Sequence, residues 1–196
     1  MHRIPLRLLA PLAGLVLAGC FAGDGGERPG GGAGAGGAAD PAGPRAAPAL
    51  TGRLADGGSY ELPRQSVTPT VLLFFRGSYC PLCLARMRDM AAYAGAYADA
   101  GVHVVAVTLD APEVAQRTSH DVDFRYPIVS VDPATFLRWG VWPPGQVQPR
   151  PGDFVVDGAG RIRYGRVGSD AADRPSDVTL LGVLDSLRAA GALAAR

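Results

Sequence analysis

The chain has 196 residues, enough for one domain of common size with extensions. Its 19 lysines and arginines nearly balance its 18 aspartates and glutamates, and a net charge of +1 gives no electrostatic reason to expect nucleic acid as a partner. Three cysteines are too few for a domain held together by disulfides.

The N-terminus has the composition of an export signal. Arg3 and Arg7 give it a basic start, and the apolar stretch from Leu8 to Gly19 is short for a membrane span. The sequence Leu-Ala-Gly-Cys that ends at Cys20 resembles a bacterial lipobox. We therefore expect residues 1–19 to be a lipoprotein signal peptide and Cys20 to be lipidated, which would anchor the protein at the cell membrane, facing the extracytoplasmic side. The alternatives are an ordinary signal peptide with a stray cysteine and an uncleaved anchor helix.

Residues 20–48 are rich in glycine, alanine and proline and lack apolar periodicity. Such a segment cannot bury enough apolar surface to offset its chain entropy. We therefore expect a disordered tether that holds the following domain off a membrane surface. Residues 49–196 are then expected to form one folded domain.

The first half of this domain predicts a hairpin followed by a strand–helix–strand unit. Residues 50–62 alternate weakly around a turn and predict the hairpin. The apolar run from Val71 to Phe75 predicts a buried strand. A helix is expected from Cys80 to Ala100, because apolar residues recur there every three or four positions. Val102 to Leu109 predicts a second strand, parallel to the first through a right-handed crossover.

The second half predicts shorter elements and a closing helix. Apolar residues at helical spacing favour an amphipathic helix over Asp177 to Ala190 that covers one face of the sheet. The other expected elements are a short helix over 112–119, an extended segment over 126–131, a helix that Asp132 caps and that ends near Trp139, an irregular stretch over 141–151, and an antiparallel hairpin over 154–164.

Two cysteines lie where the first strand gives way to the first helix, directly after Tyr79. Unpaired backbone N–H groups at a helix start stabilise negative charge, so we expect Cys80 to be the exposed, attacking thiolate. Pro81 suits the first helical position. Cys83, one turn further and roughly 5–6 Å away, suits a resolving thiol. The alternatives are a structural disulfide and half of a zinc site, although a structural zinc needs four ligands, and haem attachment would need His in place of Leu84. We expect no cofactor and no metal.

Four segments carry a family resemblance: LLFFRGSYCPLC, VVAVTLD, YPIVSVD and PGDFVVDGAGRIRY. They are similar to the thioredoxin-like redoxin superfamily, in its peroxiredoxin-like alkyl hydroperoxide reductase/thiol-specific antioxidant (AhpC/TSA) branch, over about Leu50 to Ala190. The resemblance implies an α/β, thioredoxin-like fold, with a central mixed β-sheet flanked by helices and an N-terminal β-hairpin. It also implies that Cys80 is the attacking thiol and that Cys83 is its partner.

The same resemblance implies a proline that faces the cysteine pair. Thioredoxin folds carry a cis-proline in the loop before a late strand, and Pro151 matches that position. The Arg150–Pro151 bond is therefore expected to be cis. The alternative is an ordinary trans-proline in a proline-rich loop.

The chain departs from typical peroxiredoxins at two places. They have Thr three residues and Pro seven residues before the attacking cysteine, where this chain has Gly77 and Leu73. They also have Arg three residues before the phenylalanine of the late strand, where this chain has Pro151, with Arg150 one step away. Arg150 and Arg76 are therefore candidates to stabilise a thiolate by their charge, the alternative being solvated arginines.

Three functions follow as alternatives. The first is an exported, membrane-tethered, peroxiredoxin-like oxidoreductase that reduces peroxides with Cys80 and Cys83 and is reset by an external dithiol. The second is a thiol–disulfide oxidoreductase that acts on disulfides of exported proteins, as in cytochrome maturation. The third is a copper-binding redoxin chaperone, since thiolates with imidazole suit copper, or a redoxin module without catalytic activity. The missing threonine favours the second function, and the family context favours the first.

Overall fold

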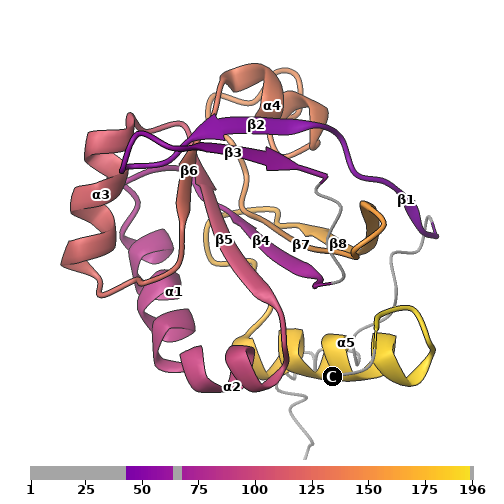
Figure 1. The fold of residues 1–196 in the computed structure, drawn as a ribbon. Coiled ribbons are helices and arrows are strands. Elements are labelled where there is room, and N and C mark those ends of the chain that lie inside the picture. The colour runs from indigo at the N-terminus through magenta and orange to yellow at the C-terminus, as the bar shows by residue number, and fades with distance from the viewer. Residues whose placement is uncertain (1–42, 64–67, 195–196) are drawn as a thin grey trace, which may run out of the picture. The chain divides into compact units, whose positions relative to one another are not determined.

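The computed structural model describes residues 43–63 and 68–194 of the chain. In these residues the chain forms one mixed sheet with helices on both faces (Figure 1). The strands are β1 (Arg45–Ala46), β2 (Leu50–Arg53), β3 (Ser59–Leu62), β4 (Thr70–Phe74), β5 (His103–Thr108), β6 (Ile128–Ser130), β7 (Gly152–Val156) and β8 (Arg161–Val167). The helices are α1 (Pro81–Ala92), α2 (Ala94–Asp99), α3 (Pro112–Asp121), α4 (Pro133–Arg138) and α5 (Asp177–Ala189). The predicted α/β class, with a mixed sheet and an N-terminal hairpin, is confirmed.

The sheet has the order β1-β8-β7-β4-β5-β6-β2-β3, so that β4 lies near its middle. Strand β4 pairs in parallel with β5 and antiparallel with β7. A strand with neighbours on both sides and layers on both faces has no exposed positions, and all five residues of β4 are buried. The strand–helix–strand unit predicted from the sequence is present as β4, α1 and β5.

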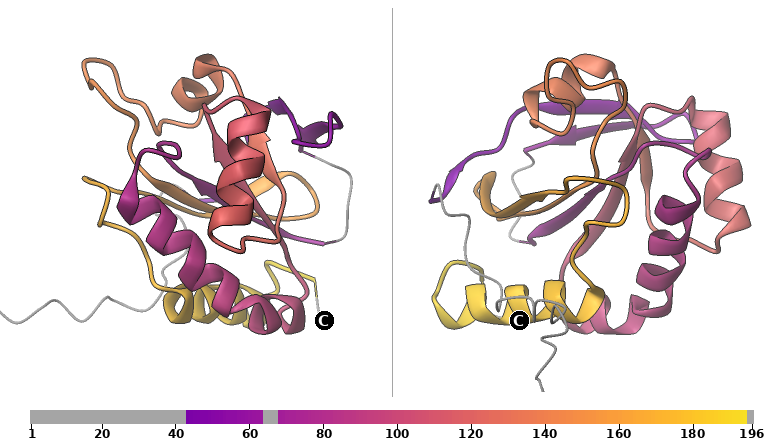
Figure 2. Two further views of the ribbon diagram at one scale, coloured as in Figure 1. Left: turned by 90° about the vertical axis from the view of Figure 1, so that its left-hand side faces the viewer. Right: turned by 180° about the vertical axis from the view of Figure 1, so that it is seen from behind.

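Alternate side chains of β4 enter two separate cores, as strand geometry requires. Val71 and Leu73 pack with α1, α2, α3 and α5 on one face. Leu72 and Phe74 pack on the other face against α4, through Phe136, and against the β2–β3 hairpin. Figure 2 shows α1 and α5 together on one side of the sheet and α4 on the other. The cysteines belong to the first core.

The helix predicted from Cys80 to Ala100 is broken in the structure. It divides into α1 and α2 at Tyr93, whose N–H group points at the carbonyls of both Asp89 and Met90. This tightening of the last turn redirects the chain, and Tyr97 of α2 is fully buried. Local periodicity continues across the break, so the sequence pattern did not reveal it.

The folded sheet begins earlier than expected. The signal peptide, Cys20 and most of the predicted tether lie outside the described residues, but β1 falls inside the segment 20–48 and pairs with β8. The backbone of Ala47 donates to Gly160, and Arg161 donates to the carbonyl of Pro44 at 2.6 Å. These bonds hold residues 44–47 against the late hairpin, so the sheet includes residues that precede position 49. No helix in the described ranges combines the length and apolar character that a membrane crossing needs.

Candidate active site

A tight loop between β4 and α1 places Cys80. Gly77 has a φ of +139°, which L side chains rarely adopt, and a Cβ there would lie 2.8 Å from Oδ1 of Asp110. The other carboxylate oxygen of Asp110 accepts the N–H of Ser78 at 2.7 Å. The N–H of Cys80 then bonds to the carbonyl of Gly77 at 3.1 Å. Glycine at position 77 is therefore what lets the chain turn sharply enough to begin α1 at this point.

Cys80 and Cys83 form a disulfide at the N-terminus of α1. Cys80 is the N-cap residue and Pro81 follows at the first helical position, as predicted. The two Cα atoms are 5.2 Å apart, within the range expected for one helical turn. The N–H of Cys83 points at the sulfur of Cys80 at 3.2 Å. This donor and the helix dipole favour negative charge on Cys80 once the disulfide opens.

The exposure predicted for Cys80 is wrong in this oxidised state. Cys80 is only 5% exposed and Cys83 only 1%, and both belong to the core beneath α1. The reason is the turn from Gly77 to Cys80, which directs the sulfur inward while Tyr79 points outward and is 59% exposed. Cys80 remains the more accessible of the two cysteines, which favours it as the residue that an external reagent meets first.

Arg174 is the arginine that contacts the disulfide. Its Nη2 lies 4.0 Å from the sulfur of Cys83 and donates to the carbonyl of Phe74 at 2.9 Å. Burial lowers the pKa of Arg174 to about 10, so the group is still charged at neutral pH. This residue was missed from the sequence alone, because it lies in the loop before α5, far from the cysteines along the chain, and no local pattern marks it.

Asp153 of β7 faces Arg174 from the sheet. One carboxylate oxygen lies 3.8 Å from Nη1 of Arg174, and both side chains are buried. Desolvation raises the pKa of Asp153 to about 6, although the nearby charges of Arg174 and Arg86 oppose the rise. Between about pH 4 and pH 6, Asp153 therefore keeps its proton in the folded protein but loses it in the unfolded chain. As a result, the contribution of Asp153 to the free energy of unfolding falls as the pH rises through this range. An acidic residue at the start of an apolar strand was the signal that could have identified it.

A second buried ion pair lies behind the first. Asp177, at the start of α5, accepts from Arg86 of α1 at 2.5 Å and from the hydroxyl of Tyr97 at 2.7 Å. Burial and the bond to Asp177 raise the pKa of Tyr97 well above its ordinary value. The network joins α1, α2 and α5, and so it fixes the helix that carries Cys83.

Neither arginine that the sequence favoured contacts a sulfur in the described part of the chain. Arg76 is half-buried and donates from Nε to the carbonyl of Pro149 at 2.9 Å, so it holds the proline-rich loop. Arg150 is also half-buried, and its backbone N–H donates to Val141 at 2.7 Å. The arginine that lies beside a sulfur in the oxidised protein is Arg174 instead.

The cis conformation predicted for the Arg150–Pro151 bond is also wrong. Within the described residues the cis peptide bond is Leu62–Pro63. Pro151 leads without interruption into β7, and its carbonyl accepts the N–H of Gly168 at 2.9 Å. The chain is extended at this point and needs no reversal, so the ordinary trans bond fits.

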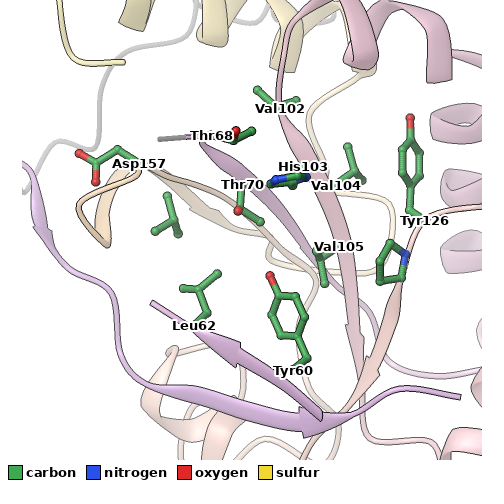
Figure 3. Close-up of a pocket in the computed structure, with 12 residues that line it drawn as sticks. Tyr60, Leu62, Thr68, Thr70, Val102, His103, Val104, Val105, Tyr126 and Asp157 are labelled. Carbon is green, nitrogen blue, oxygen red and sulfur yellow. The ribbon is translucent and has the colours of Figure 1, made fainter. Parts of the chain in front are cut away.

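The cavity drawn in Figure 3 lies away from the cysteines. It has a volume of about 470 Å³, and its lining includes Thr70 and His103, the first residues of β4 and β5. Cys80 follows the opposite end of β4. Within residues 43–63 and 68–194, no three side chains of His, Cys, Asp or Glu gather in a group that could hold a metal ion, which gives the copper-binding alternative no support.

Comparisons with known proteins identify the family and the fold of the chain. The AhpC/TSA family profile matches residues 44–165. No curated protein matches the chain in sequence. Among solved structures, a peroxiredoxin-like protein from Aquifex aeolicus has a TM-score of 0.62 at 16% identity, covering 72% of this chain and 85% of its own. Peroxidoxin BcpB from Mycobacterium tuberculosis has a TM-score of 0.59 at 19% identity, covering 74% and 95%. A yeast mitochondrial 1-Cys peroxiredoxin has a TM-score of 0.65 at 15% identity, covering 75% and 76%.

The structural likenesses establish the fold, and the profile establishes the family. The mixed sheet with flanking helices is the thioredoxin-like fold that these peroxiredoxins share. The matched segment includes β4, the disulfide, β7 and most of β8. The chain belongs to the AhpC/TSA family and is a peroxiredoxin-like oxidoreductase.

Proposed function

We propose that the chain reduces peroxides with Cys80 as the attacking sulfur and Cys83 as the resolving sulfur. The observation that carries the proposal is the closed disulfide at a helix N-terminus in a member of the AhpC/TSA family. The Cys80 thiolate attacks one peroxide oxygen, the O–O bond breaks, a sulfenic acid forms, and the leaving alkoxide or hydroxide takes up a proton. The Cys83 thiolate then attacks the sulfur of Cys80, the disulfide forms, and hydroxide leaves as water.

An external dithiol would restore the reduced pair. In the yeast mitochondrial 1-Cys peroxiredoxin, the thiol is resolved via glutathione and thioredoxin systems. In this chain, attack by an incoming thiolate is directed to Cys80, because that cysteine is the more accessible of the two. The leaving sulfur is then Cys83, which lies beside Arg174, and a second attack from the reductant releases Cys80.

Disulfide exchange with exported proteins is the second candidate. It is favoured by two apolar side chains beside the cysteines, Tyr79 at 59% and Leu82 at 53% exposure. Leu82 also lines a groove of about 570 Å³ along α1, together with Tyr93, Val178 and Arg174. Exposed apolar groups around a reactive disulfide suit a protein substrate. Gly77, which stands where typical peroxiredoxins have threonine, also favours disulfide exchange over peroxide reduction.

The relative rates of two reactions decide between these candidates. Reduced full-length protein is mixed with hydrogen peroxide, the reaction is quenched by alkylation, and the disulfide is counted by mass spectrometry. Insulin reduction is measured in parallel, with the Cys80→Ser/Cys83→Ser double variant as the control for both. If the protein reduces peroxides, hydrogen peroxide should oxidise its cysteine pair much faster than it oxidises free cysteine, and insulin reduction should be slow. Fast insulin reduction with peroxide oxidation no faster than that of free cysteine would establish the exchange function instead.

We also propose that the protein is exported and held at the membrane by a lipid on Cys20. The support is the sequence alone, in which a basic start, a short apolar stretch and a lipobox-like ending agree. Expressed in a bacterial host, the wild-type chain is expected in the detergent-soluble membrane fraction, and Cys20→Ala is expected to lose that association. Equal membrane association of both forms would contradict the lipid anchor, and labelling with a radioactive fatty acid reports the modification independently.

A further inference from the structure

The buried charges around Cys83 are balanced only while the disulfide is closed. Arg174 and Arg86 supply two positive charges, and Asp153 and Asp177 supply two negative ones. All four side chains are buried, and a disulfide carries no charge. The oxidised protein therefore has a neutral cluster next to the second sulfur.

Reduction disturbs this balance. A thiolate on Cys83 would lie beside Nη2 of Arg174, which is 4.0 Å from the sulfur in the oxidised protein. The new charge is favoured by this guanidinium but makes the buried cluster negative, and an uncompensated buried charge is costly. A proton delivered to the cluster would restore neutrality. Oδ1 of Asp153 is buried and has no hydrogen-bond partner among the described residues, so it can accept that proton.

We propose that Arg174 and Asp153 are positioning residues for Cys83: Arg174 holds Cys83 as a thiolate in the reduced enzyme, and Asp153 takes up a proton when the disulfide is reduced. The inference rests on the proposed function only in requiring the pair to cycle between disulfide and dithiol. In reduction, a thiolate of the external dithiol attacks the sulfur of Cys80, and the electron pair of the broken Cys80–Cys83 bond stays on Cys83. The second thiolate of the dithiol then displaces Cys80, the dithiol leaves as its own disulfide, and of its two protons one is taken up by Asp153 and the other passes to Cys80 or to solvent. In oxidation, the Cys83 thiolate attacks the Cys80 sulfenic acid, and Asp153 returns the proton as hydroxide leaves as water.

The surroundings of Asp153 support this role. Its pKa of about 6 in the oxidised protein lies close enough to neutrality for one additional negative charge to raise it past pH 7. The charged and titratable groups that act on Asp153 come from the loop before α5, from α1, from α5 and from β8. They are Arg174, Arg86, Asp177, Arg166 and Tyr164. Arg174 is the group that touches both the carboxylate and the sulfur, so it couples the two.

The test measures the pKa of Cys83 in full-length Cys80→Ser protein, from the ultraviolet absorbance of its thiolate. Cys80→Ser/Cys83→Ser protein provides the baseline and removes the contribution of Cys20. Adding Asp153→Asn removes a negative charge and is expected to lower the pKa of Cys83 by about one unit, and adding Arg174→Gln is expected to raise it by about one unit. Each shift is a tenfold change in the thiolate-to-thiol ratio. Opposite shifts support the proposal, because loosened packing would not move one pKa in both directions. Shifts in the same direction, or no shift in either variant, would overturn it.

A second measurement uses the wild-type protein, so it tests proton uptake by Asp153 even if the Asp153→Asn and Arg174→Gln variants do not fold. Infrared difference spectra of the wild-type protein at pH 7, before and after reduction with dithiothreitol, are expected to gain the C=O band of a protonated carboxyl. A spectrum without that band would overturn proton uptake by Asp153. Neither experiment contains peroxide, so a failure of this inference is distinguishable from a failure of peroxide reduction.

Discussion

Replacing Cys80 with serine is expected to lower peroxide turnover roughly 10³-fold or more, since the substitution removes the group that attacks the oxygen. Cys83→Ser is expected to abolish turnover as well, but for a different reason. Its Cys80 can still react once, and without a partner sulfur the sulfenic acid persists. The measurement is trapping with a sulfenic-acid reagent, followed by mass spectrometry of the peptide that contains both positions.

The two serine variants control for each other, because both lose the disulfide and keep the same fold elements. A trapped sulfenic acid on Cys80 in the Cys83→Ser protein confirms the assigned roles. If Cys83 in the Cys80→Ser protein formed sulfenic acid at the wild-type rate, the roles of the two sulfurs would be exchanged. Arg174, which lies against Cys83, would then stabilise the attacking thiolate rather than the resolving one.

Asp177→Asn is expected to lower the free energy of unfolding by about 3–5 kcal/mol, the range for removing one partner of a buried ion pair. Asp177 neutralises Arg86 at 2.5 Å and accepts the hydroxyl of Tyr97 at 2.7 Å, both inside the core. An asparagine keeps the shape but leaves the guanidinium of Arg86 buried without its counter-charge. Urea unfolding of the oxidised protein, followed by circular dichroism, measures the loss.

Asp123→Asn is the matched control. Asp123 pairs with Arg125 at 3.1 Å, but both side chains are exposed, so water and salt screen the pair. Its φ of 49° also suits asparagine, and the backbone should not be strained by the change. We expect no measurable change in stability. An equally small change for Asp177→Asn would show that the buried network does not hold α1 and α5 together.

Local patterns predicted most of the fold. The apolar runs at Val71 and Val102 became the paired central strands β4 and β5, because a strand buried on both faces needs apolar residues at every position. Asp132 caps α4 through its bond to the N–H of Thr135 at 2.8 Å, and the spacing of the cysteines and Pro81 predicted the N-terminus of α1. Each of these features depends on residues close together in the sequence, which is why the sequence alone could reveal them.

Features that depend on residues far apart in the sequence were either missed or predicted wrongly. The burial of Cys80 results from the turn at Gly77 and from packing in the core, and the contact between Cys83 and Arg174 joins residues 91 positions apart. Asp153 also contacts Arg174 through the tertiary structure, between β7 and the loop before α5. Proline spacing alone could not distinguish a trans from a cis bond before Pro151. The residues around the disulfide therefore had to be read from the tertiary structure.

Titration of the reduced full-length protein with hydrogen peroxide tests the central claim most directly. We expect one equivalent of peroxide to be consumed per chain, and the peptide spanning Cys80 and Cys83 to lose two hydrogens as the disulfide forms. Peroxide that is not consumed, or a peptide that gains oxygen without forming the disulfide, would contradict peroxide reduction by this cysteine pair.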